Sequence, residues 1–172
     1  MLTDAYYAII TFMERGGQVL PLIAVLTFVM WTLIFERLWY FQTEHRQVIR
    51  RAVEKWEGRE ERRSWTAHQI REAMISEAAE KIQGTLPFIL TLVAIAPMFG
   101  LLGTVTGMVQ VFDAMATQGG NARSMAAGVQ AATIPTMAGM VASLSGVLGT
   151  TVLSRKVEFE TELFQDHLTM DH

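Results

Sequence analysis

The side chains that could carry chemistry in this sequence are hydroxyls that lie inside segments without charge. Two long stretches, residues 82–112 and 124–154, contain no Asp, Glu, Lys, Arg or His. A hydroxyl donates one hydrogen bond and accepts two, so a row of them could carry water or protons along an apolar surface. A hydroxyl can also bond back to its own helix, and then no function follows. Four hydroxyl residues are the candidates for a proton pathway or pore lining: Thr104, Thr136, Ser143 and Thr150.

On a helical wheel, residues 124–154 divide into a small side and a bulky side. The small side consists of Gly128, Ala132, Thr136, Gly139, Ser143, Gly146 and Thr150. The bulky side consists of Ile134, Met137, Val141, Leu144, Leu148 and Val152. In residues 82–112, Gly100, Gly103 and Gly107 cluster on one side, with Thr104 at its edge. Small residues let membrane helices approach closely, so we expect the glycines to pack helices. We expect Thr104 and Thr136 to face a shared interior, either a water-accessible lumen or the seat of another helix.

Pro97 and Pro135 lie inside the same two stretches. Each proline removes one helix hydrogen bond and leaves a carbonyl that hydroxyls or water can satisfy in a membrane. The simplest interpretation is a tolerated kink, and the alternative is a flexing point or a carbonyl on an ion path. Proton carriers in membranes are normally Asp, Glu or His side chains. If this protein moves protons, a partner must therefore supply the carboxylate.

A third charge-free stretch, residues 16–35, precedes the other two. Each of the three is long enough to cross a bilayer, which needs roughly 20 apolar residues. The sequence therefore predicts an all-α membrane protein with three transmembrane helices. Its 51% hydrophobic content excludes a disordered chain, and the absence of cysteine excludes disulfide and thiol chemistry. A net charge of −3 argues against nucleic acid as a partner.

The placement of basic residues predicts the topology. Most Lys and Arg residues lie between residues 36 and 81, Arg155 and Lys156 follow the third stretch, and Arg15 is the first basic residue. By the positive-inside rule the N-terminus is outside and the C-terminus inside, and we expect no cleaved signal peptide. The expected segments are a periplasmic N-terminal segment (1–15), transmembrane helix 1 (16–40), a cytoplasmic helical loop (41–84), transmembrane helix 2 (85–118), a periplasmic turn (119–123), transmembrane helix 3 (124–154) and a cytoplasmic tail (155–172).

The cytoplasmic segments are expected to be helical extensions of the spans. Apolar residues recur at helical spacing across residues 45–83, and the charged cluster 57–63 interrupts them as a surface break. The tail is amphipathic as well, and we expect these faces to pack on one another. No phosphate loop, dinucleotide fingerprint or His/Cys cluster is present, so we expect no enzyme activity, cofactor or metal.

Three stretches of the sequence carry recognisable motifs. Residues 94–108 read AIAPMFGLLGTVTGM, and residues 128–142 read GVQAATIPTMAGMVA. The first resembles the second-span motif of the MotA/TolQ/ExbB proton-channel family, roughly A-P-x-x-G-L-[FL]-G-T-V-x-G, and the second resembles that family's third-span pattern, G-[IV]-x-x-A-x-x-x-T-x-x-G-[LM]-[VF]-A. Residues 36–40 read ERLWY, similar to the end of the first span in short ExbB-like members.

The resemblance implies a homopentamer in the bacterial inner membrane whose second and third spans line a central pore. An ExbD-like single-span partner would supply an Asp inside that pore, and a TonB-like protein would receive the work for outer-membrane import. The family's pore threonines fall on Thr104 and Thr136. One position departs from the pattern: many members carry Glu where this chain has Ala131. Two alternatives stay open, namely a TolQ-like subunit of the Tol-Pal system and a structural membrane scaffold that conducts nothing.

Overall fold

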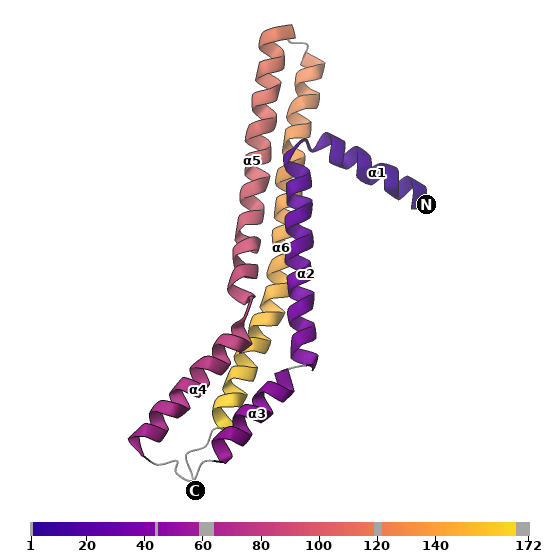
Figure 1. Cartoon of the computed structure of the whole chain (residues 1–172). Coiled ribbons are helices and arrows are strands. Elements are labelled where there is room, and N and C mark those ends of the chain that lie inside the picture. The colour runs from indigo at the N-terminus through magenta and orange to yellow at the C-terminus, as the bar shows by residue number, and fades with distance from the viewer. Residues whose placement is uncertain (1, 44, 59–63, 119–121, 168–172) are drawn as a thin grey trace. The chain divides into compact units, whose positions relative to one another are not determined.

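The computed structural model describes residues 2–43, 45–58, 64–118 and 122–167 and contains only α-helices as regular elements within them (Figure 1). The helices are α1 (Leu2–Arg15), α2 (Val19–Thr43), α3 (His45–Glu57), α4 (Trp65–Gln83), α5 (Leu86–Gln118) and α6 (Ala122–His167). Three long helices are apolar enough to cross a membrane. The expected all-helical fold with three apolar helices is therefore confirmed. The sequence patterns above do not predict α1.

Local chemistry explains where the helices begin and end. Gly17 separates α1 from α2 with a φ of 66°, a left-handed conformation that glycine adopts at little cost. The side chain of Ser64 caps α4 by accepting a hydrogen bond of 3.2 Å from the backbone N–H of Ala67. Gly84 ends α4 with a φ of 45°, and its N–H donates to the Glu80 carbonyl at 2.9 Å.

The expected break at residues 57–63 falls between α3 and α4, and residues 59–63 lie outside the described residues. The same holds for residues 119–121 of the expected periplasmic turn. The expected third span and tail form one helix, because α6 runs for 46 residues without interruption. A helix of that length measures about 69 Å, more than twice the hydrocarbon thickness of a bilayer.

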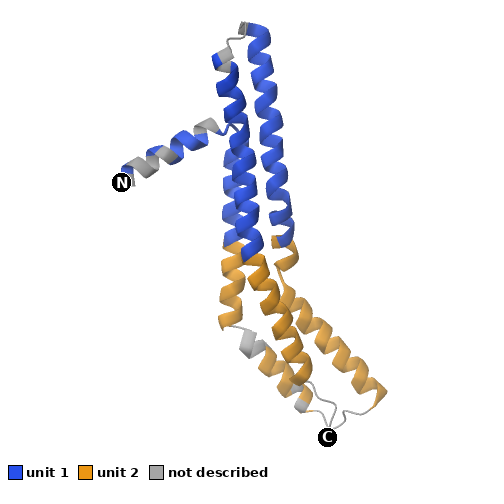
Figure 2. Cartoon of the chain, turned by 180° about the vertical axis from the view of Figure 1, so that it is seen from behind, with its two compact units in different colours: residues 1–31, 90–148 blue, residues 32–89, 149–172 orange. Residues whose placement is uncertain are grey.

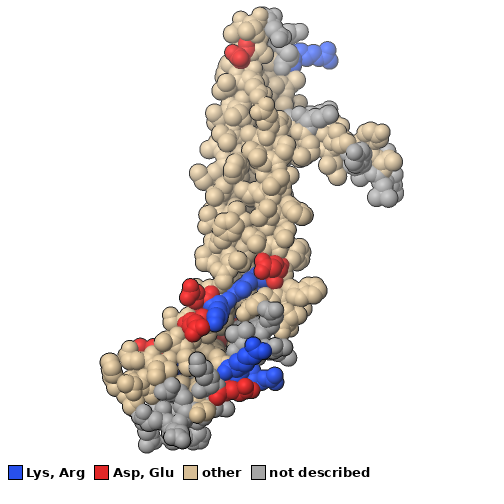
Figure 3. Space-filling view, in the orientation of Figure 1, with Lys and Arg blue, Asp and Glu red and all other residues tan. Residues whose placement is uncertain are grey.

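The chain divides into two compact units (Figure 2). Unit 1 comprises residues 1–31 and 90–148, and unit 2 comprises residues 32–89 and 149–172. On the face of unit 1 that Figure 3 shows, charged side chains appear only near the end of α5 and the start of α6. The charged residues of unit 2 gather over its helices instead, so the two units differ sharply in polarity.

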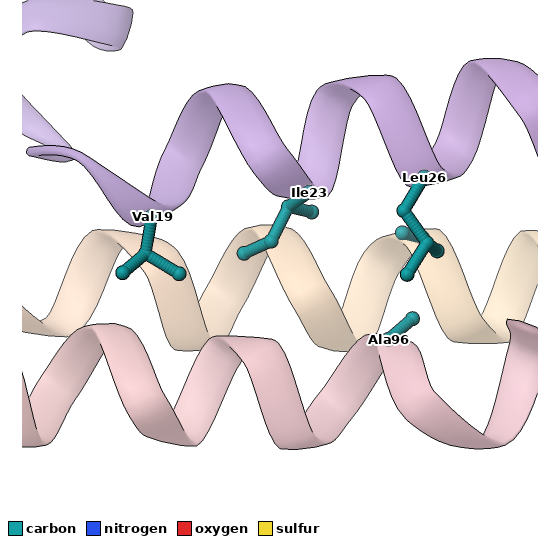
Figure 4. Close-up of a cluster of buried hydrophobic side chains, with 5 residues drawn as sticks. Val19, Ile23, Leu26 and Ala96 are labelled. Atoms are coloured by element: carbon teal, nitrogen blue, oxygen red, sulfur yellow. The ribbon is translucent and has the colours of Figure 1, made fainter.

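The core of unit 1 joins three helices along a line of small and aliphatic side chains. Val19, Ile23 and Leu26 of α2 point toward the neighbouring helices, and Ala96 of α5 lies opposite Leu26 (Figure 4). Ala142 of α6 completes the cluster. Met30 is fully buried and approaches Gly146 of α6. Burial of these side chains places α5 and α6 side by side in unit 1.

The core of unit 2 is built on large aromatic side chains. Trp56 of α3 and Phe164 of α6 are each 1% exposed and pack with Ala67 of α4. Partly buried aliphatic residues of α3 and α4 surround them. The amphipathic faces that the sequence predicts for these segments thus cover one another within unit 2.

Candidate functional site: a hydroxyl pair between α5 and α6

The hydroxyls of Thr104 and Thr136 meet between α5 and α6 in unit 1. Their Oγ1 atoms form a hydrogen bond with each other. Thr136 Oγ1 also donates to the carbonyl of Gly100 at 2.9 Å, and Thr104 Oγ1 lies 3.3 Å from the same oxygen. Both threonines are half-buried. The structure therefore brings together the two residues that the sequence selects as pore threonines.

The count of hydrogens defines what this pair can do. Two hydroxyls carry two hydrogens, and one bond to the Gly100 carbonyl plus one bond between the hydroxyls uses both. The remaining outward-facing groups are lone pairs, which accept a hydrogen bond from water or from a protonated acid. To donate to a carboxylate, the pair must turn one hydrogen away from Gly100. The site can thus respond to the protonation state of an acid placed beside it.

Glycines make this close approach possible. A Cβ added at Gly100 would lie 3.0 Å from the Pro135 carbonyl oxygen and 3.0 Å from the Thr136 Cα. A Cβ at Gly103 would collide with the Pro135 ring. Because each neighbour belongs to the backbone or to a rigid ring, neither position has room for a side chain. The absence of a side chain at Gly100 and Gly103 thus allows α6 to come this close to α5.

The other glycines on the list of packing residues lie against neighbours of their own unit. Gly107 faces the Ala132 Cβ, Gly128 faces Val111, Gly139 faces the Ala96 carbonyl oxygen, and Gly146 faces Met30 and Val93. The small side of α6 in unit 1 thus packs on α5 and α2. The bulky side of α6 is not covered by the other helices of this chain. Its residues Met137, Val141, Leu144 and Leu148 are 61%, 66%, 67% and 72% exposed.

The two remaining hydroxyl candidates lie at different depths. Ser143 is half-buried and donates to the Val93 carbonyl of α5 at 3.1 Å. Thr150 belongs to unit 2 and is 3% exposed. Pro97 and Pro135 both lie inside continuous helices, α5 and α6. The pathway role expected for Ser143 and Thr150 stays a prediction.

The hydroxyl pair stands in an uncharged setting. No group of three or more His, Cys, Asp or Glu residues that could hold a metal ion occurs among the described residues. The charge-free stretches contribute hydroxyls, side-chain amides, carbonyls and apolar groups, and no ionisable side chain. Chemistry at this site must therefore use hydrogen bonds, because the two stretches supply no titrating side chain of their own.

Arg37 follows an apolar stretch, where a basic residue indicates membrane topology and no further role. It is 7% exposed, and its Nη2 donates to the carbonyls of Lys81 and Ile82 at the end of α4. Its guanidinium also lies 4.5 Å from the ring centre of Tyr40. Two sequence features could have indicated this role of Arg37: its place in the ERLWY ending, and Gly84, where a side chain would collide with the guanidinium.

Two comparisons with known proteins agree with this picture. Residues 41–166 match the family model described as the MotA/TolQ/ExbB proton channel family. The Tol-Pal system protein TolQ of Pseudomonas aeruginosa is 34% identical over 85 residues, which cover 49% of this chain and 37% of that protein. An ExbB-like biopolymer transport protein of Synechocystis sp. is 40% identical over 62 residues, which cover 34% of this chain and 24% of that protein.

The apolar helices and the uncharged site define a multi-pass membrane protein. Since the family model covers most of the sequence, the chain belongs to the MotA/TolQ/ExbB proton channel family. The family consists of channel subunits, so the chain is a transport protein and not an enzyme. The chain matches well under half the length of either curated relative, and the relatives carry names from both the TolQ and the ExbB branch.

Proposed function

We propose that this chain is an ExbB-like subunit of a motor in the bacterial inner membrane that converts proton flow into mechanical work. In this proposal the N-terminus is periplasmic, the C-terminus is cytoplasmic, and α5 and α6 of several copies, five by family resemblance, surround a central axis. An ExbD-like single-span protein occupies that axis, and a TonB-like protein receives the work for import across the outer membrane. Lipid covers the outer surface.

One observation carries the proposal: the two threonines at the family-motif positions share a hydrogen bond and the Gly100 carbonyl. A partner carboxylate that approaches this pair meets lone pairs when it is protonated and meets a donated hydrogen when it is ionised. The threonine pair can therefore form a hydrogen bond with the partner's carboxyl group in both of its protonation states. The change between them requires one threonine hydroxyl to rotate. Ala131 stands where many relatives have Glu, so the carboxylate of the partner does the titrating.

The uncharged wall supports the mechanical part of the proposal. An ion pair in a low-dielectric pore would hold the partner in one orientation, because charges attract strongly where water is scarce. Hydroxyls and small apolar residues offer weaker contacts that many orientations can satisfy. A partner can then turn against such a wall after each protonation.

Replacing Thr136 by Val tests the hydroxyl role at nearly constant volume. We expect Thr136→Val to assemble normally and to lose proton-driven uptake of an iron complex in cells that depend on this chain. Thr133→Val is the matched control, because Thr133 is exposed and its hydroxyl donates to the Gln130 carbonyl of its own helix at 2.7 Å. Full uptake by the Thr136→Val variant would reject the proposal.

A TolQ-like subunit is the second candidate, because the longer of the two relative matches is to TolQ. Expression of this chain with its neighbouring genes in strains that lack either system separates the two: restored iron-complex uptake supports the ExbB-like role, and restored outer-membrane integrity supports the TolQ-like role. A structural scaffold predicts neither, and it predicts no proton leak when the chain and its partner are placed in vesicles.

A further inference from the structure

Ser143 faces a carbonyl that the helix itself cannot satisfy. In an α-helix the N–H of residue 97 would bond to the carbonyl of Val93, but Pro97 has no N–H. The Ser143 hydroxyl of α6 donates to this oxygen at 3.1 Å. We propose that Ser143 is a positioning residue: its hydroxyl replaces the hydrogen bond that Pro97 omits and so fixes the register of α6 against α5.

A second bond repeats the arrangement two turns away. Thr136 of α6 donates to the Gly100 carbonyl of α5 at 2.9 Å. The two donors are seven residues apart on α6, and the two acceptors are seven residues apart on α5, as antiparallel helices require. Seven residues make about two turns and about 10.5 Å, so both bonds lie on one face of each helix.

Small residues line the contact around these bonds. Gly139, between the two bonds, lies against the Ala96 carbonyl oxygen and the Gly100 backbone, and Gly107, beyond the second bond, lies against Ala132. Such contacts allow the backbones of α5 and α6 to approach closely. A slide by one turn would bring Ala132 against Val111, where a Cβ on Gly128 would already collide with a Val111 methyl. It would also remove both hydroxyl bonds and leave the Val93 oxygen unpaired in an apolar surrounding, which is unfavourable. Packing and the hydroxyl bonds therefore both oppose the shifted register.

The consequence concerns the hydroxyl pair. Thr104 and Thr136 come from different helices, so their mutual bond exists only in the observed register. Ser143 therefore acts on the pair through the register and not as a further step of a proton path. This inference requires only the hairpin geometry, so it can stand even if the chain conducts no protons.

Cysteine cross-linking can measure the register, because the natural chain has no cysteine. A Cβ built at Gly128 lies 3.6 Å from the Cβ of Val111, which fits a disulfide. The pair Val111→Cys with Gly128→Cys reports the observed register in the full chain in native membranes. The pair Val111→Cys with Ala132→Cys reports a slide by one turn, because Ala132 otherwise opposes Gly107.

We expect Ser143→Ala to raise the rate of the shifted cross-link relative to the observed one by about threefold to tenfold, the range for one hydrogen bond between membrane helices. Ser143→Thr keeps a hydroxyl and should keep the original ratio. Pro97→Ala restores an N–H for the Val93 oxygen, so in that background Ser143→Ala should change the ratio by less than about twofold.

Two results would overturn the inference: an unchanged ratio in Ser143→Ala, or an equal effect of Ser143→Ala with and without Pro97. If the Ser143→Ala chain fails to accumulate in the membrane, the double variant Pro97→Ala/Ser143→Ala tests the inference instead. Accumulation of Pro97→Ala/Ser143→Ala supports the role of Ser143, and its absence rejects it. Because the readout is a cross-link ratio, a failure here differs from loss of uptake in Thr136→Val.

Discussion

Units 1 and 2 are each stabilised from within, by opposite kinds of packing. In unit 1, small glycine and alanine residues let α5 approach α6 until backbone atoms are in contact. Unit 2 relies on large groups, namely the buried Trp56 and Phe164 and the guanidinium of Arg37. An added methyl group should therefore damage unit 1, whereas a removed side chain should damage unit 2.

Both units also satisfy helix carbonyls that lack their usual partner, but with different donors. In unit 1 the Ser143 hydroxyl bonds to the carbonyl opposite Pro97. In unit 2 the Arg37 guanidinium bonds to two carbonyls at the end of α4. A guanidinium is always charged and holds a fixed geometry, which suits a permanent joint. A hydroxyl is neutral and can turn, which suits a wall beside a titrating partner.

The largest loss of stability is expected for Trp56→Ala in unit 2. Truncation of a fully buried tryptophan leaves a cavity beside Ala67 and Phe164 and should cost about 3–5 kcal/mol. Thermal unfolding of the purified protein in detergent, followed by circular dichroism, measures the change. Trp65→Ala is the matched control, because Trp65 is 76% exposed and its loss should leave the midpoint nearly unchanged. Equal effects of the two variants would contradict the aromatic core.

Arg37→Ala should have the next largest effect. The change leaves the carbonyls of Lys81 and Ile82 without their charged donor. One hydrogen bond to a charged group contributes about 1.5–3 kcal/mol, and because a single Nη2 atom makes both bonds we expect a total loss of about 2–4 kcal/mol. Arg37→Lys should recover only part of it, because an ammonium lacks the planar fork of a guanidinium. The measurement is the unfolding midpoint in detergent.

Arg50→Ala is the control for Arg37. Arg50 is exposed and makes a 3.8 Å ion pair with Glu54 on its own helix, an arrangement that contributes little. A midpoint for Arg37→Ala that matches that of Arg50→Ala would show that Arg37 does not anchor the end of α4.

The sequence is sufficient to predict three apolar helices and to select Thr104 and Thr136, because charge-free length and helical periodicity are local properties. That the two threonines line a pore stays a prediction. It also identifies Pro97 as the source of a free carbonyl. It cannot show which donor satisfies that carbonyl, because the register between α5 and α6 depends on contacts 50 residues apart in the chain. Ser143 therefore appeared as one more hydroxyl in a row.

Arg37 shows the same limit in unit 2. A basic residue just after an apolar stretch reads as a topology signal, and most such residues are exposed. Burial of this one follows from its place between the aromatic rings of Tyr40 and Phe41 and the end of α4. Those partners lie in another helix or depend on the fold, so the residue type alone does not reveal them.

Gly139→Ala tests whether close backbone contact stabilises unit 1. Its new Cβ would lie 2.6 Å from the Ala96 carbonyl oxygen and 3.1 Å from the Gly100 Cα, so α5 and α6 must separate and the cost should be about 1–3 kcal/mol. Gly149→Ala in unit 2 is the control, because its Cβ would meet the Ile34 Cδ1 at 3.0 Å, the movable end of a side chain. We expect a lower unfolding midpoint for Gly139→Ala than for Gly149→Ala.

Since separation of α5 and α6 also lengthens the bond between Thr104 and Thr136, proton-driven uptake should fall in Gly139→Ala even where the variant accumulates normally. A Gly139→Ala variant with the stability and uptake of the unmodified chain would show that close backbone contact does not hold unit 1 together.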